Sequence, residues 1–129
     1  MKFLHVILAM ILCSLMVSCE SSETGGGSKK ASVEADSALF APASSKARTQ
    51  NDEGVGHYQQ GHWDVAAGHF AKAVKADSNS AVAHYNFALT LDKKGKHEEA
   101  TASFKKALEV ASNDPLITDS EILKKHVGM

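Results

Sequence analysis

The sequence predicts an all-α fold, a short solenoid of two helix hairpins and a closing helix. Three observations indicate it. Only two prolines interrupt the 129 residues, and alanine, the strongest helix former, is abundant in the second half. From Ala47 onward, similar residues recur with a period of 34. Within each period, alanine and phenylalanine follow helical spacing, so they form an apolar stripe along one helix face.

The first residues predict export and lipid attachment. Lys2 precedes an apolar run over residues 3–16, which is typical of an export signal. The run leads into Met16-Val17-Ser18-Cys19, which resembles the lipobox of bacterial lipoproteins. That resemblance implies a diacylglycerol thioether on Cys19, with residues 1–18 removed as a lipoprotein signal peptide. Cys13 does not fit the motif, because the bulky Leu12 precedes it.

Two alternatives for this region remain open: an uncleaved transmembrane anchor and an ordinary secretory signal. An anchor is disfavoured because roughly 15 apolar residues in a helix span about 22 Å, less than the ~30 Å hydrocarbon core. Glu20 follows the cysteine in place of the aspartate that resembles an inner-membrane retention signal. We therefore expect a protein of the bacterial cell envelope, anchored by lipid in the outer membrane and facing the periplasm.

Residues 19–46 are rich in serine, glycine and alanine, and predict a lipidated flexible linker. The linker contains one apolar island, Ala38-Leu39-Phe40-Ala41, which stops at Pro42. The island is either a docking motif or a transient helical turn. We favour the transient turn, because this composition buries too little apolar surface to offset chain entropy.

The periodic region divides into two units, residues 47–80 and 81–114. Each unit holds two helical stretches around a glycine, the residue that most readily ends a helix in the left-handed conformation. Acidic residues then suit the first turn of the next helix. The residues that match at this period are Ala47 and Ala81, Gly61 and Gly95, Ala66 and Ala100, Phe70 and Phe104, Lys72 and Lys106, and Ala73 and Ala107.

This order of small, glycine and aromatic residues resembles the tetratricopeptide repeat. The resemblance implies a right-handed α-solenoid of antiparallel helix pairs. The first unit departs from the family pattern at Gln50 and Glu53, and Gly54 and Gly56 weaken its first helix by roughly 1 kcal/mol each relative to alanine.

Residues 115–129 resemble the solvating helix that closes tetratricopeptide arrays. Asp114 predicts its N-cap, and Pro115 its first turn. Asp119 is an alternative start. The apolar face is expected at Leu116, Leu123 and Val127.

The family resemblance implies a concave face that binds protein or peptide ligands, lined by the first helix of each unit. We therefore predict a membrane-anchored adaptor or scaffold that is not an enzyme and binds an unidentified protein or peptide. The alternatives are a structural, self-associating envelope protein, which would be a homo-oligomer, and a histidine-based metal-binding protein. The groove positions are Asn51, Val55, Tyr58, Gln59, Tyr85, Asn86, Leu89 and Lys93.

Charge and motifs disfavour other functions. With 14 basic and 15 acidic residues the chain carries no basic excess, so nucleic acid is not an expected partner. No His-x₃-His or Glu-x-x-His pair places two ligands one helical turn apart among the seven histidines, and we predict neither a metal site nor a cofactor. His57, His84 and His97 are expected to act as partly buried aromatic side chains, and His69 to face solvent.

Overall fold

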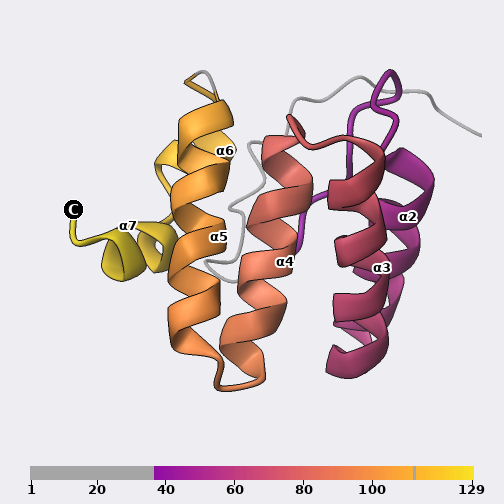
Figure 1. Ribbon diagram of the computed structural model, residues 1–129, viewed down its shortest axis with the longest axis horizontal. Coiled ribbons are helices and arrows are strands. Elements are labelled where there is room, and N and C mark those ends of the chain that lie inside the picture. Colours follow the sequence, from indigo (N-terminus) through magenta and orange to yellow (C-terminus); the bar gives the residue numbers. More distant parts are fainter. Residues whose placement is uncertain (1–36, 112) are drawn as a thin grey trace, which may run out of the picture. The chain divides into compact units, whose positions relative to one another are not determined.

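A computed structural model describes residues 37–111 and 113–129, and every regular element within them is an α-helix. Four long helices form two hairpins that lie side by side (Figure 1). The first hairpin is α2 (Arg48–Gln59) and α3 (Trp63–Ala76), and the second is α4 (Ala81–Lys93) and α5 (His97–Val110). Helix α4 also packs against α3 and α2. This arrangement confirms the predicted helical-repeat solenoid.

The two hairpin turns have the same structure. Gly61 and Gly95 both adopt φ of 75°, the left-handed conformation that glycine reaches without strain. In the first turn, the Gly61 and His62 amides donate to the carbonyls of Tyr58 and His57 at 3.0 Å each. In the second, the Gly95 and Lys96 amides donate to Asp92 and Leu91 at 2.9 Å each. Both are Schellman motifs, as the placement of glycine predicts.

The apolar stripe on the second helix of each hairpin forms the core. Ala66 and Phe70 of α3 are fully buried, and so are Ala100 and Phe104 of α5. Small residues at the helix crossings allow this close approach. Gly54 of α2 shows how close it is, because a Cβ atom built there would lie 2.6 Å from Cε1 of Phe70. Gly54 therefore has a packing role that its low helix propensity does not reveal.

The single closing helix predicted over residues 115–129 is wrong. The chain forms two short helices, α6 (Pro115–Thr118) and α7 (Glu121–Val127). Asp114 caps α6 through the Leu116 amide, as predicted. The break occurs because Ser120 is extended and accepts a hydrogen bond from the Leu123 amide, which starts a second helix.

The break also changes which apolar residues are buried at this end. Leu116 is 51% exposed, contrary to expectation, and its neighbour Ile117 is fully buried instead. Leu123 is fully buried, as expected, and Val127 packs against the core as a partly buried side chain. Among the described residues, no helix has the length and apolar character needed to cross a bilayer.

Candidate peptide-binding groove

The residues predicted to line the concave face lie on α2 and α4, but most of them do not face solvent. Gln59 and Lys93 are exposed. The other six are buried: Asn51, Val55, Tyr58, Tyr85, Asn86 and Leu89. The surface predicted to be open for a ligand is therefore largely covered within this chain.

The covering segment is the chain itself, residues 37–42. The backbone of Leu39 lies between α2 and α4, and its amide donates to Oδ1 of Asn86 at 2.8 Å. Its carbonyl accepts two hydrogen bonds, from Nδ2 of Asn86 at 2.6 Å and from Nδ2 of Asn51 at 2.9 Å. Figure 1 shows the indigo and purple chain before α2 running close to α4. Helix side chains thus bind an extended backbone through both of its polar groups.

The interpretation of residues 38–41 as a transient helical turn is therefore wrong. These residues have no helical structure. Ala38 and Ala41 are buried in the same core cluster as the groove residues, and the Ala41 amide donates to Oδ1 of Asp52 at 3.2 Å. Phe40, the largest side chain of the segment, is 63% exposed. The groove accepts small side chains at two positions and leaves the aromatic one outside.

The two buried asparagines form one network whose polar atoms are all paired. Nδ2 of Asn86 also donates to Oδ1 of Asn51 at 2.8 Å, and Nδ2 of Asn51 also donates to Asp52 at 3.3 Å. The network fixes the orientation of both carboxamides, because Oδ1 of Asn86 must face the Leu39 amide donor. A buried carboxamide without partners would be costly. The asparagines therefore require an extended backbone, or an equivalent set of polar groups, between them.

The two tyrosines expected to contact a ligand are held by intramolecular contacts. The hydroxyl of Tyr85 lies 2.9 Å from Oγ of Ser120, the N-cap of α7. The ring of Tyr58 makes an edge contact with Trp63, with ring centroids 4.9 Å apart. Both tyrosines therefore contribute to the folding of the groove walls.

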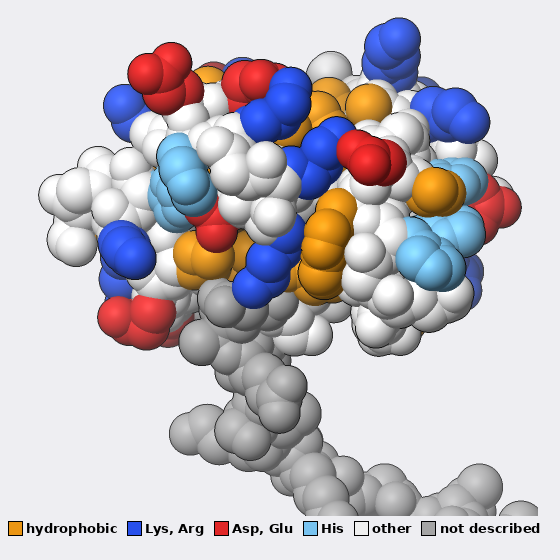
Figure 2. Space-filling model, turned by 90° about the horizontal axis from the view of Figure 1, so that it is seen from below, with side chains coloured by type: hydrophobic (Ala, Val, Ile, Leu, Met, Phe, Trp, Pro, Cys, Tyr) orange, Lys and Arg blue, Asp and Glu red, His pale blue; other side chains and the backbone are white. Residues whose placement is uncertain are grey.

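The histidines differ in part from expectation. His84 is buried and its Nε2 lies 3.0 Å from the Ser78 carbonyl oxygen. His97 was expected to be partly buried, but as the first residue of α5 it is at an open helix end with a side chain 68% exposed. His69 was expected to face solvent but is only 21% exposed and stacks on His57, with centroids 5.3 Å apart. Figure 2 shows histidine side chains gathered at two places on one face.

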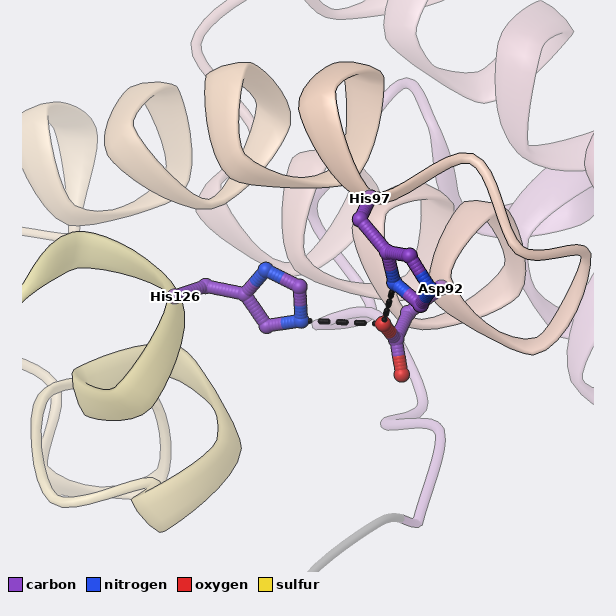
Figure 3. A group of neighbouring side chains, drawn as sticks. All are labelled: Asp92, His97 and His126. Carbon is purple, nitrogen blue, oxygen red and sulfur yellow. Dashed lines mark hydrogen bonds and ion pairs between the residues drawn. The ribbon is translucent and has the colours of Figure 1, made fainter.

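One cluster of ionisable side chains, on three different helices, was not predicted from the sequence. Asp92, His97 and His126 come from α4, α5 and α7, and each offers one ligand atom within 4.8 Å of the others (Figure 3). Burial raises the pKa of Asp92, but the hydrogen bond from His97 and the charge and hydrogen bond of His126 together lower it below its ordinary value. The search for ligands one helical turn apart could not find this group, because its members lie on three different helices.

Comparison with known proteins supports part of this picture. Residues 81–114 match the family model of the tetratricopeptide repeat. No curated protein and no solved structure gives a significant match to the chain. Helix repeats of this kind present extended concave surfaces for binding. The helix pair of α4 and α5 is therefore a tetratricopeptide repeat, a module that generally mediates binding between proteins.

Proposed function

We propose that this chain is an adaptor that captures an extended peptide segment of another protein in the groove between α2 and α4. The observation that carries the proposal is the pairing of Leu39 with Asn51 and Asn86, described above. These contacts involve only backbone atoms of the bound segment, so a segment from another protein could make the same contacts. In the resting state, residues 37–42 fill the groove and a partner must displace them.

The groove also defines the class of partner. The bound segment must be extended, with small side chains at the positions of Ala38 and Ala41, which are buried. The two positions are three residues apart, and the large side chain between them, Phe40, stays outside. A segment with small residues at its first and last positions, an apolar residue at the position of Leu39 and any residue at the position of Phe40 fits the groove, because Leu39 packs against the core and Phe40 is exposed. A segment with a charge at either small position would have to bury that charge, which is strongly unfavourable.

The experiment opens the groove without changing its walls. In the full chain, Ala38→Glu with Ala41→Glu should release residues 37–42. This variant should bind a labelled, end-blocked peptide of residues 37–42 at least about 100-fold more tightly than the parent, because a short tether gives the parent's own segment a millimolar effective concentration. Fluorescence anisotropy measures the binding, and circular dichroism verifies that the helices remain.

Two controls make this result specific. A peptide with glutamate at both alanine positions should not bind, and adding Asn86→Ala to the opened variant should abolish binding of the original peptide. Equal binding by the parent and the opened variant, or binding that persists without Asn86, would contradict the proposal.

Self-association is the second candidate function, because the segment that fits the groove belongs to this chain. Residues 37–42 of one copy would then fill the groove of another. Sedimentation equilibrium of the full chain across a range of concentrations distinguishes the two candidates. A monomer throughout supports the adaptor, and a dimer that dissociates when Ala38 and Ala41 are replaced by glutamate supports self-association.

The proposed adaptor acts at a membrane of the bacterial cell envelope, held by lipid on Cys19, and this part is supported by the lipobox-like sequence alone. Residues 1–36, including the expected signal peptide and Cys19, lie outside the described residues. Cys19→Ala should leave an unprocessed precursor that takes up no labelled palmitate. Normal processing of that variant would refute the anchor. Fractionation of the parent protein between inner and outer membranes tests the expected outer-membrane location.

A further inference from the structure

The group of Asp92, His97 and His126 has the geometry of a small ligand set. Oδ1 of Asp92 lies 2.7 Å from Nδ1 of His97 and 2.9 Å from Nε2 of His126. Figure 3 shows both imidazole rings directed at this one carboxylate oxygen. Two neighbouring lysines are engaged elsewhere, since Lys94 pairs with Asp64 and Lys96 with Glu99. The groups that face Asp92 in this cluster are therefore nitrogen ligands.

Thr101 determines that Nδ1 of His126 carries a hydrogen atom. The hydroxyl of Thr101 donates to the carbonyl oxygen of His97 at 2.8 Å, because a carbonyl can only accept. The same hydroxyl oxygen lies 3.0 Å from Nδ1 of His126, so it must accept the hydrogen of that nitrogen. In neutral His126 the other nitrogen, Nε2, then carries a lone pair. This lone pair faces the negative oxygen of Asp92.

A positive charge between Nε2 of His126 and the carboxylate of Asp92 is needed to stabilise two electron-rich atoms that lie 2.9 Å apart. A proton on Nε2 or a metal cation between the ligands would supply it. A hydrogen bond from the ring nitrogen that does not bind metal, here Nδ1 of His126 to Thr101, is the kind of contact that orients a metal-binding histidine. The three ligands, two imidazoles and one carboxylate, suit zinc and related divalent cations.

We propose that Asp92, His97 and His126 bind one divalent transition-metal cation, with zinc as the representative ion and a fourth position open to water. Tetrahedral bonds of about 2.0–2.1 Å place ligand atoms roughly 3.3 Å apart. The carboxylate and the rings therefore have to separate by about half an ångström, which the exposed His97 permits. The bound ion links α7 to the turn between α4 and α5, and so fastens the C-terminal end of the fold.

Zinc binding to the full chain, followed by equilibrium dialysis, tests the site. His97→Gln is the main variant, because this side chain is exposed and its loss leaves the fold intact. We expect the parent to bind one more equivalent of zinc in the micromolar range than His97→Gln or Asp92→Asn. The cysteines of the N-terminal region are present in every variant, so the difference reports this site alone.

Two further variants sharpen the result. Thr101→Val removes the hydroxyl that contacts Nδ1 of His126, together with its hydrogen bond to the His97 carbonyl, and should weaken zinc binding by roughly 10-fold or more. His62→Gln, which removes a ring 5.8 Å from that of His57 and away from this site, should bind zinc as the parent does. Zinc should also slow hydrogen exchange of the α7 amides in the parent and not in His97→Gln. Equal zinc binding by the parent and His97→Gln would overturn the proposal. A proton on Nε2 of His126 would then supply the positive charge that faces Asp92.

Discussion

Replacing Asn86 by alanine should lower the free energy of unfolding by about 3 kcal/mol, because each buried polar group left unpaired costs roughly 1–3 kcal/mol. The substitution removes both hydrogen bonds to Leu39 and the donor to Oδ1 of Asn51. Residues 37–42 can respond by leaving the groove, which limits the loss to the free energy of docking that segment plus the cost at Asn51.

Urea unfolding of the full chain measures this change, with Gln59→Ala as the matched control. Gln59 carries an exposed carboxamide on α2, so its loss should change the unfolding free energy by less than about 0.5 kcal/mol. If Asn86→Ala were as stable as the control, the asparagine network would not hold the segment.

Two neighbouring glycines of α2 should respond in opposite directions to the same substitution. Gly54→Ala should destabilise the protein by roughly 1–3 kcal/mol, because the new Cβ would overlap the buried ring of Phe70, 2.6 Å from its Cε1. Gly56→Ala should stabilise it by about 0.5–1 kcal/mol, because a Cβ there meets nothing within 4 Å and alanine favours a helix.

Thermal and urea unfolding of the two variants give the comparison, and each variant is the control for the other. The sequence alone assigns both glycines the same cost in helix propensity, so it predicts that both substitutions stabilise. A stabilised Gly54→Ala would show that α2 does not approach Phe70 as closely as described.

The helix hairpins could be predicted from the sequence because their causes are local and periodic. Gly61 and Gly95 specify a left-handed residue at a fixed place in each repeat, and the alanine and phenylalanine stripe follows the period of a helix. The break at Ser120 was harder to predict. Apolar spacing continued past it, and only the capping hydrogen bond to Leu123 decides that a second helix begins.

The predicted groove residues were expected to be open to a ligand, but six of the eight are buried. Residues 37–42 have the composition of a linker, and their partner Asn86 lies 47 positions from Leu39. No local pattern reports hydrogen bonds across such a separation, and the buried side chains of the segment are the small ones of Ala38 and Ala41, with Leu39 partly buried against the core. The sequence did contain one signal for the bound segment, an asparagine in the first helix of each repeat, Asn51 and Asn86. A carboxamide that is buried by the fold needs hydrogen-bond partners.

Hydrogen exchange at the Leu39 amide tests most directly whether the groove binds an extended backbone and whether this chain already fills it. In the full chain at neutral pH, the account predicts exchange at least about 100-fold slower than in an unstructured peptide, an opening free energy near 2.7 kcal/mol. The protection should disappear in Asn86→Ala while amides of α4 and α5 remain protected. Exchange of Leu39 at the unstructured rate in the parent protein would contradict the account.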